Sequence, residues 1–170
     1  MAFEKMLEEY TARRATALGM GGPDKLARRK KAGQLNARER IAALVDDDSF
    51  IESGLFGTSG VYPEQAHETP ADGKIAGYAR IDGRDVAIVV NDFTVKGAST
   101  SATNGKKVAH MKRTAAERGM PLVVIGESTG ARLPDAMGSR GMGLLLGNDI
   151  TQFRRTRETP LAAAVTGPSF

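Results

Sequence analysis

The sequence has no cysteine and no tryptophan, and aromatic residues make up only 5% of its 170 residues. Without cysteine, a disulfide scaffold, a thiolate zinc site and a cysteine nucleophile are all excluded. The lack of cysteine is compatible with a reducing compartment. The first residues lack the apolar run of a signal peptide, and no apolar stretch is long enough to cross a membrane. We therefore expect a cytoplasmic protein that does not enter a membrane.

The remaining composition is that of a soluble globular chain, with 41% hydrophobic and 26% charged residues. The net charge of +4 is small, but basic residues crowd one segment: Lys25, Arg28, Arg29, Lys30, Lys31, Arg38 and Arg40. Such a run is either a solvated helix face or an anion site. Because no aromatic residues are interleaved for base stacking, a phosphorylated small molecule is favoured over nucleic acid.

The N-terminal third is expected to be helical. Apolar residues at helical spacing predict a helix over residues 2–18, and a second is expected over 24–31. Asn36 and Glu39 match a capping box before a short third helix that carries Ile41, Leu44 and Val45. The run Asp46–Asp48 ends it. We interpret residues 1–56 as an N-terminal arm, followed by a partial domain over 57–170.

The rest of the chain alternates strands and helices. After an irregular connection over 57–73, apolar runs over 74–81 and 84–91 flank Asp82-Gly83, a strong hairpin signal. The run 86–90 is almost uninterrupted, as in a strand buried on both faces. A loop over 93–104, a helix over 105–118, a strand over 121–125, a loop over 126–135, a helix over 136–157 and a strand over 161–165 should follow. This order predicts an α/β fold with a largely parallel sheet.

Residues Gly126 to Gly130 form a G-x-S-x-G pattern after a buried strand, which raises a serine hydrolase using Ser128 as an alternative. The hydrolase order needs a later histidine, but His67 and His110 both come earlier. Alternatively the glycines merely turn the chain. A loop at the carboxyl end of a strand is also where open α/β sheets bind ligands, with backbone N–H groups directed at an anion. No metal site is expected.

Several segments, taken together and in order, resemble a known family. They are GQLNARERI at 33–41, DSFIE at 48–52, DFTVKGAS at 92–99, ESTGAR at 127–132 and the strand that leads to Gly167-Pro168. This series resembles the front part of carboxyltransferase (β) subunits of biotin-dependent acyl-CoA carboxylases, of the propionyl-CoA carboxylase type. Each match alone is weak, whereas the combination from residue 33 onward is specific.

The resemblance implies a crotonase-like ββα fold and a carboxyltransferase. Such an enzyme moves a carboxyl group from carboxybiotin, held on a separate carrier, to the α-carbon of an acyl-CoA through a thioester enolate. No covalently bound cofactor and no metal are implied. Implied partners are an acyl-CoA, a biotin carboxylase or biotin carrier subunit, and further copies of the same chain, with no nucleic acid or membrane. The alternative is a non-catalytic acyl-CoA-binding or assembly half of a split enzyme. A decarboxylating or thioester-cleaving relative is a weaker possibility.

Carried over residue by residue, the resemblance implies that the Thr129, Gly130 and Ala131 amides form one half of an oxyanion site. The coenzyme A candidates are Phe93, Gly97, Ala98, Ser99, Arg38, Arg40, Lys106 and Lys107. Thr129 stands where the family usually has Gly, and its Cβ restricts φ. The family's Gly-Gly turn would come just after Phe170, so residues 1–170 alone are expected to be inactive.

Overall fold

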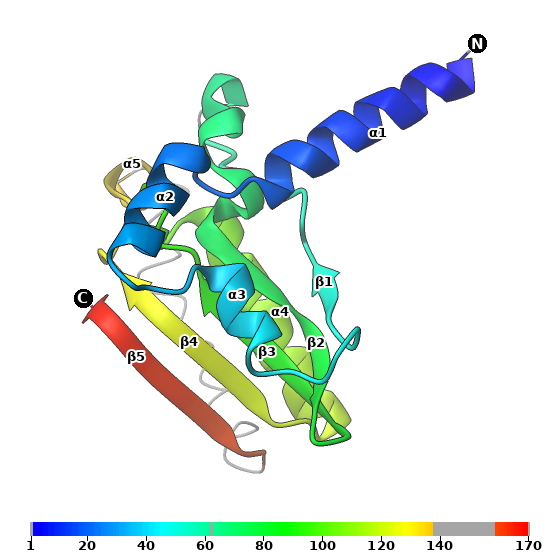
Figure 1. Ribbon diagram of the computed structural model, residues 1–170, viewed down its shortest axis with the longest axis vertical. Helices are drawn as coiled ribbons and strands as arrows, with labels where there is room; N and C mark the ends of the chain where they lie inside the picture. The colour runs from blue at the N-terminus through cyan, green and yellow to red at the C-terminus, as the bar shows by residue number, and fades with distance from the viewer. Residues whose placement is uncertain (1, 62, 138–158, 170) are drawn as a thin grey trace.

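The computed structural model describes residues 2–61, 63–137 and 159–169 (Figure 1). Within these ranges the strands form one mixed five-stranded sheet in the order β1-β2-β3-β4-β5. The strands are β1 Ile51–Ser53, β2 Lys74–Ile81, β3 Arg84–Asn91, β4 Leu122–Ser128 and β5 Leu161–Ser169. The first three are antiparallel, whereas β3, β4 and β5 run parallel. The predicted α/β class is confirmed, but the sheet is mixed, with β1-β2 and β2-β3 antiparallel, instead of largely parallel.

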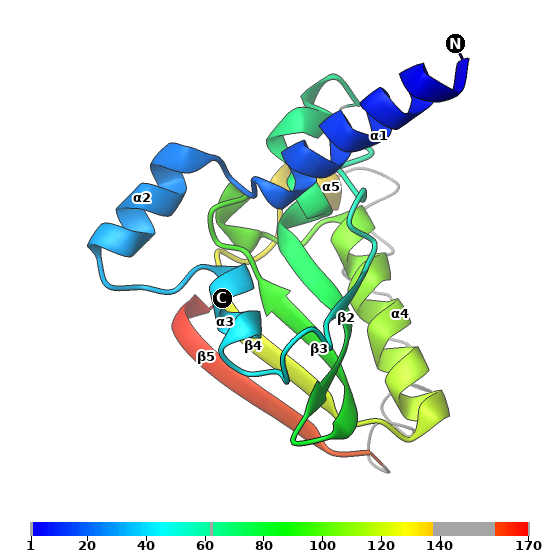
Figure 2. The ribbon, with the colours of Figure 1, turned by 45° about the vertical axis from the view of Figure 1, so that its right-hand side comes forward.

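Helices cover the two faces of the sheet and split the core in two (Figure 2). On one face, Ile41 of α3 (Ala37–Ala42) packs with Ile75, Ile88 and Val90. On the other, Met111 of α4 (Ala102–Arg118) packs with a cluster built on β2, β3 and β4. Successive residues of β3 alternate between these clusters, so the strand is buried on both faces, as its apolar run predicted.

The β2–β3 hairpin follows from its two turn residues. Asp82 and Gly83 have φ of 51° and 75°, the pair of positive values that a type I′ turn requires. The Asp46 carboxylate accepts hydrogen bonds from both of their N–H groups, each 2.9 Å long. The expected hairpin is confirmed. The prediction that Asp46–Asp48 end the third helix is wrong, because α3 (Ala37–Ala42) ends at Ala42 with Ala43 as its C-cap, and Asp46 instead fixes the hairpin turn.

The first two helices begin and end close to where the pattern placed them, whereas the third ends at Ala42, before Leu44 and Val45. Helix α1 spans Ala2–Leu18 and α2 spans Pro23–Lys31. Helix α3 has the predicted capping box, in which the Glu39 N–H donates to Asn36 Oδ1 and the Asn36 N–H to Glu39 Oε2. Met20 joins the core beside α3, whereas α1 extends away from the body (Figures 1 and 2). Dividing the chain at residue 56 remains a prediction.

Several predicted boundaries were wrong. Helix α4 begins at Ala102 instead of 105, because Ser101 caps it and pairs with Asn104. Strand β4 continues through Gly126–Ser128, where the sequence predicts a loop, and the short helix α5 (Leu133–Ala136) follows. Strand β1 was missed, and β5 is longer than predicted. The connection 57–73 contains the 3-10 turns η1 (Pro63–Glu68) and η2 (Pro70–Gly73). The helix predicted over 136–157 lies almost wholly outside the described residues.

Candidate active site at the carboxyl end of the parallel strands

Two segments singled out from the sequence meet at the carboxyl ends of β3 and β4. The Thr129 N–H donates to the Gly97 carbonyl over 3.0 Å, and the Thr100 N–H donates to the Gly130 carbonyl over 2.7 Å. The Arg132 N–H returns to the Thr100 carbonyl over 2.8 Å. The loop after β3 and the loop after β4 are therefore joined by backbone hydrogen bonds, at the edge where α/β sheets bind ligands.

The loop after β3 contains a left-handed turn, and a second one lies beside it. Lys96, Gly97 and Ala98 of the 3-10 turn η3 (Lys96–Ala98) have φ of 47°, 62° and 51°. The stretch 71–73, Ala-Asp-Gly, has φ of 49°, 48° and 70°. L-residues rarely adopt such values, which cost on the order of 1–3 kcal/mol each and cluster at functional sites. The Asp92 N–H donates to the Gly73 carbonyl and links the two turns.

Arg132 ties the second loop to the turn at 71–73. Its Nη1 donates to Asp72 Oδ1 over 2.6 Å, and its Nε donates to Ser99 Oγ over 3.2 Å. Asp72 is fully buried, and its other oxygen accepts from the Ser101 hydroxyl and the Asn104 N–H. A buried carboxylate is tolerated when it is paired and hydrogen-bonded in this way. The network fixes both loops relative to the N-terminus of α4.

Two lysines lie beneath the turns with little exposure. Lys74 Nζ donates to Asn91 Oδ1 over 2.9 Å and to the Ala98 carbonyl over 3.3 Å. Lys107 Nζ donates to the Ala71 carbonyl over 3.0 Å and to the Lys74 carbonyl. Burial lowers the pKa of each ammonium to about 8, although Asp72 opposes the shift. Both lysines support the backbone of the turns with charge-assisted hydrogen bonds.

A second ionic cluster lies at the end of β4. The Glu127 carboxylate is buried and pairs with Arg29 of α2, and with Arg40 of α3 over 3.4 Å. The Arg29 guanidinium also lies 5.9 Å from the centre of the Phe93 ring. One β-strand carboxylate thus holds two N-terminal helices against the sheet.

Nearby, the pKa of Asp92 is raised by burial, against hydrogen bonds from the Thr94 hydroxyl and N–H that lower it. The Lys25 ammonium donates to the Thr94 carbonyl over 3.0 Å, so Lys25 is a second side chain of α2, after Arg29, that reaches the loop after β3. This loop is therefore held between α2 on one side and the left-handed turn at 71–73 on the other.

The three amides predicted for an oxyanion site differ in what they contact. The Thr129 N–H donates to Gly97, and the Gly130 N–H donates to Ser128 Oγ over 3.2 Å. Among the described residues, no acceptor is found for the Ala131 N–H, and Ala131 is exposed. Of the three amides, it is the one without a hydrogen-bond acceptor in this part of the chain. An oxyanion role for the loop remains a prediction.

The predicted coenzyme A residues fall into two groups. Phe93, Gly97, Ala98 and Ser99 line the joined loops, with Ala98 and Ser99 buried. The cations are dispersed over the molecule. Arg38 forms a bidentate pair with Glu52 at 2.8 and 3.2 Å, Arg40 contacts Glu127, and Lys107 holds carbonyls, while Lys106 is exposed on α4. Three of the four therefore already have protein partners, and their phosphate role remains a prediction.

Ser128, the nucleophile of the hydrolase alternative, has a structural role, because its hydroxyl holds the backbone of the two loops. Its hydroxyl donates to the Ala98 carbonyl over 3.2 Å and accepts from the Gly130 N–H. The His67 and His110 rings contact the Glu64 carbonyl and Arg113 instead. In the ranges that the structure covers, no His, Asp and Glu side chains gather as a metal site, and no helix is both long and apolar enough to span a bilayer.

With this geometry described, comparison with known proteins identifies the family. The carboxyl transferase domain matches residues 28–170. The chain belongs to the carboxyl transferase domain family. The joined loops and the left-handed turns all lie inside the matched range, whereas α1 and the start of α2 precede it.

The similar curated proteins include a carboxylase subunit and a decarboxylase subunit. The chain is 34% identical over 99% of its length to a propionyl-CoA carboxylase carboxyltransferase subunit of Haloferax mediterranei, of which it covers 33%. It is 36% identical to a methylmalonyl-CoA decarboxylase subunit alpha of Veillonella parvula, over 69% of this chain and 23% of that one. The chain thus spans about a third or less of the length of these relatives.

Solved structures confirm the crotonase-like carboxyltransferase fold. A single-chain long-chain acyl-CoA carboxylase superposes with a TM-score of 0.80 at 30% identity, covering 95% of this chain and 17% of that one. Transcarboxylase 12S with methylmalonyl-coenzyme A and methylmalonic acid bound gives 0.78 at 27% identity, covering 97% of this chain and 32% of that one. The fold and family suggested by the motif series are therefore confirmed.

Sequence reasoning missed Asp72, Asn104 and Glu127 as organising residues of the site. Asp72 is 60 residues from Arg132, and nothing in the local pattern signals that pairing. Glu127 stood within a quoted motif, but its arginine partners were interpreted as phosphate ligands or as a solvated face. A carboxylate inside an apolar strand would have been the signal, because such a group must be paired.

Proposed function

We propose that this chain forms the acyl-CoA half of a carboxyltransferase active site. In the proposed reaction the carboxyl group leaves a nitrogen of carboxybiotin and bonds to the α-carbon of an acyl-CoA. The α-proton passes to that biotin nitrogen, so no protein side chain acts as base. The developing negative charge lies on the thioester oxygen, which preorganised N–H donors would stabilise.

One observation carries the proposal. The two motif-bearing loops that the sequence keeps 30 residues apart are joined by hydrogen bonds at the carboxyl end of the parallel strands, for example from Ser128 Oγ to the Ala98 carbonyl. Family membership supports the reaction class. The two relatives found by sequence are named for propionyl-CoA and methylmalonyl-CoA, whereas one solved structure is a long-chain acyl-CoA carboxylase. On the two sequence relatives, a short acyl-CoA is the proposed substrate, and a biotin carrier is the proposed partner. A cytoplasmic location and a homo-oligomeric state are proposed with it.

Within the site, the Ala131 N–H is the proposed donor to the thioester oxygen. Thr129 and Gly130 use their own N–H groups to hold the loop, so they act by positioning. The Phe93–Ser99 loop is the proposed wall against the pantetheine arm. Lys106, exposed on α4, is the remaining candidate for a phosphate among the four predicted cations, because the other three are paired within the chain.

The test is transfer of labelled carboxyl from a carboxylated biotin carrier to propionyl-CoA by a protein in which residues 1–170 are joined to the remaining part of a carboxyltransferase, alongside calorimetric binding of propionyl-CoA to residues 1–170. Ala131→Pro removes the proposed donor, and removal of one such donor costs about 3–4 kcal/mol of transition-state stabilisation in comparable enzymes. The control is Lys112→Ala, which changes a residue of α4 and leaves the loop with Ala131 untouched. Binding without transfer would favour the non-catalytic acyl-CoA-binding half. Absence of both binding and transfer would refute the carboxyltransferase and the acyl-CoA-binding functions alike.

A second candidate is decarboxylation, which the Veillonella parvula relative favours. In this direction the carboxyl group leaves a malonyl-type acyl-CoA for biotin, and the enolate takes up a proton at the α-carbon. The same loop would stabilise the same enolate. Offering methylmalonyl-CoA with uncarboxylated carrier, and following label onto biotin, separates the preferred directions.

A further inference from the structure

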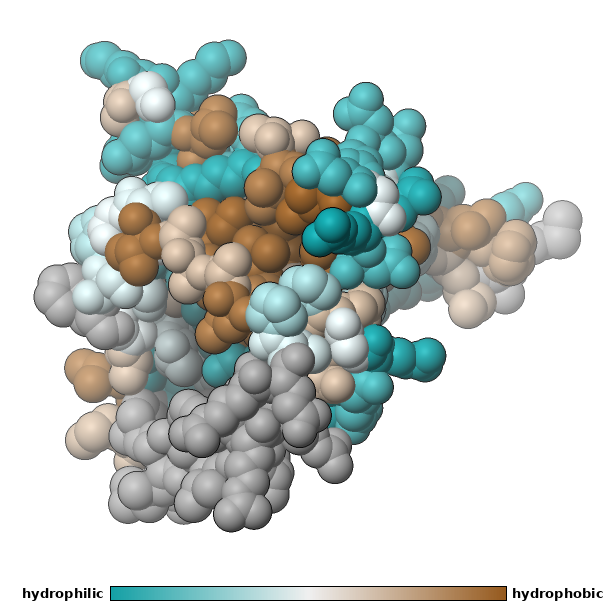
Figure 3. All heavy atoms as spheres, turned by 90° about the horizontal axis from the view of Figure 1, so that it is seen from below, coloured by the Kyte–Doolittle hydropathy of each residue, from teal (hydrophilic) through white to brown (hydrophobic). Residues whose placement is uncertain are grey.

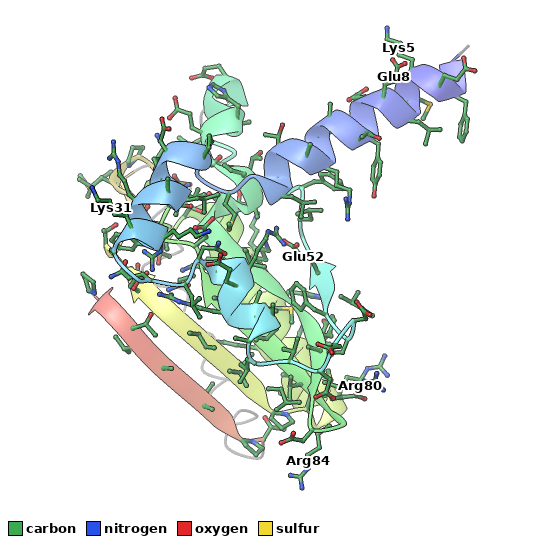
Figure 4. The ribbon with its side chains drawn as sticks, viewed as in Figure 1. Lys5, Glu8, Lys31, Glu52, Arg80 and Arg84 are labelled. Carbon is green, nitrogen blue, oxygen red and sulfur yellow. The ribbon has the colours of Figure 1, made fainter. Side chains whose placement is uncertain are left out.

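Strand β2 begins with a lysine that is almost completely buried. Lys74 is 7% exposed, whereas Arg80 of the same strand is exposed. Figure 4 shows the side chains of Arg80, Arg84 and Lys31 directed away from the body of the molecule, which is the usual position of a cation. Burying an ammonium group is unfavourable, because the group loses its hydration. A buried lysine therefore indicates a specific role.

In the described part of the chain, the Lys74 ammonium binds two neutral oxygens, Asn91 Oδ1 at 2.9 Å and the Ala98 carbonyl at 3.3 Å. The Asp72 carboxylate pairs with Arg132 instead. Burial accordingly lowers the pKa of Lys74 to about 8, although the charge of Asp72 opposes the shift. An apolar side chain of similar length would therefore serve the stability of the fold at least as well.

Both acceptors lie where the two site loops meet. Asn91 ends β3, and its Nδ2 donates to the Glu127 carbonyl near the end of β4 over 3.1 Å. Ala98 lies in the loop after β3 and has a left-handed φ of 51°. Its carbonyl also accepts from the Ser128 hydroxyl over 3.2 Å, and Ser128 Oγ accepts from the Gly130 N–H. One ammonium is thus connected to the backbone of both loops.

We infer that Lys74 is a positioning residue of the acyl-CoA site, whose ammonium holds the loops after β3 and β4 in the arrangement that presents the Ala131 N–H. The inference rests on the proposed function, in which this N–H donates to the thioester oxygen. Lys74 acts through Ala98 and Asn91 and does not contact the substrate. A buried charge that lowers stability is typical of the compromise between stability and activity at functional sites. Removing the charge should therefore loosen the loops without destabilising the fold.

The first experiment compares the stability of the fold with that of the contact between the loops. Lys74→Met should speed hydrogen exchange at least about ten-fold at the N–H groups that join the loops, because these bonds open more often. The groups, followed by NMR, are those of Thr100, Thr129 and Arg132. The midpoint of urea unfolding should be no lower than in wild type, since water can replace the ammonium at the partly exposed Asn91.

The control is Arg80→Met, which removes an exposed cation from the same strand and should change neither quantity. Unchanged exchange at the three N–H groups in Lys74→Met would overturn the inference. So would a lower unfolding midpoint with faster exchange throughout β2 and β3, because Lys74 would then only support the fold.

Because the chain has no cysteine, the charge itself can be tested at this position. Lys74→Cys is unfolded in urea, alkylated with either 2-bromoethylamine or 1-iodopropane, and refolded. The two products have side chains of the same length and shape, and end in an ammonium and a methyl group respectively. Slow exchange between the loops should return only with the ammonium. Equal exchange in the two products would mean that the charge does not hold the loops, contrary to the inference.

Calorimetric binding of propionyl-CoA to residues 1–170 connects Lys74 to the site. Lys74→Met should weaken binding by about five- to ten-fold, the value of one hydrogen bond, because the Ala131 N–H is displaced. Arg80→Met should bind as wild type does. If wild type binds and Lys74→Met binds equally well, the positioning role is refuted and the proposed function stands. If wild type does not bind propionyl-CoA, the proposed function is refuted and the positioning role with it.

Discussion

Strands β3 and β5 flank β4 on either side and pair with it in the same parallel sense, yet their surroundings are opposite. All residues of β3 from Val86 to Val90 are buried, whereas β5 is exposed along its full length. Their sequences, VAIVV and LAAAV, are both uninterrupted apolar runs. An apolar run therefore indicates what a strand can bury, and the neighbouring elements decide whether it is buried.

The surface reflects this difference. Figure 3 shows a broad apolar area on the side of the molecule seen from below. The exposed apolar side chains of β5 include Leu161 and Val165. Exposed edge strands of this kind are prone to pair with another chain. Buried and exposed copies of the same residue type provide matched pairs for experiment.

The largest expected contrast is between two leucines that are direct neighbours across β4 and β5. Leu122 is 3% exposed and its partner in the register, Leu161, is 58% exposed. Leu122→Ala should lower the free energy of unfolding by about 2–5 kcal/mol, because it leaves a cavity under α4. Leu161→Ala should stay within about 0.5 kcal/mol. Urea unfolding of both variants measures the difference, and equal losses would mean that Leu161 is covered in solution.

How much was predictable depended on how local the interaction is. The β2 and β3 boundaries were right to the residue, since Asp82-Gly83 marks the turn between them. The capping box at Asn36 was right for the same reason. The start of α4 was wrong because Ser101 and Asn104 form a capping box without Glu. Strand β1, with three residues, is too short for a periodic pattern to be recognised.

The candidate site was predictable as two loops and not as a network. Both loops follow apolar strands, and parallel strands bring their carboxyl ends together. The pairing of Arg132 with Asp72 joins residues far apart in sequence, and the left-handed φ of Ala71 and Lys96 occurs at residues that do not favour it. Tertiary contacts impose these features, so no local sequence pattern predicts them.

The next contrast is between adjacent lysines on α4, Lys107 beneath the turns and Lys106 in solvent. Burial lowers the pKa of Lys107 from 10.5 to about 8. Below about pH 8 the Lys107 ammonium is charged in both the folded and the unfolded state, so burying the charge lowers the free energy of unfolding by its full amount. Between about 8 and 10.5 the unfolded state binds more protons, so stability should rise with pH, by on the order of 3 kcal/mol at the upper limit.

The measurement is the free energy of unfolding as a function of pH above 8. Lys107→Met should flatten the rise, and Lys106→Met should leave it unchanged. Lys74 has a pKa that is also lowered to about 8, so part of the rise of the free energy of unfolding with pH should remain in the Lys107→Met variant. A slope that is identical in wild type and Lys107→Met would show that the ammonium is solvated.

The smallest contrast concerns two glycines with nearly the same backbone. Gly97 and Gly33 have φ of 62° and 69°, so replacement by Ala costs a similar left-handed strain at both. At Gly33 a Cβ would meet nothing, whereas at Gly97 it would lie 2.6 Å from Thr129 Cγ2. Gly97→Ala should therefore cost about 1–3 kcal/mol more than Gly33→Ala, the usual penalty of overpacking. In a Thr129→Gly background most of that excess should disappear, since the clashing side chain is gone. A cost at Gly97 that persists without the Thr129 side chain would place the strain in the turn itself, and would mean that the contact between the two site loops is looser than their hydrogen bonds indicate.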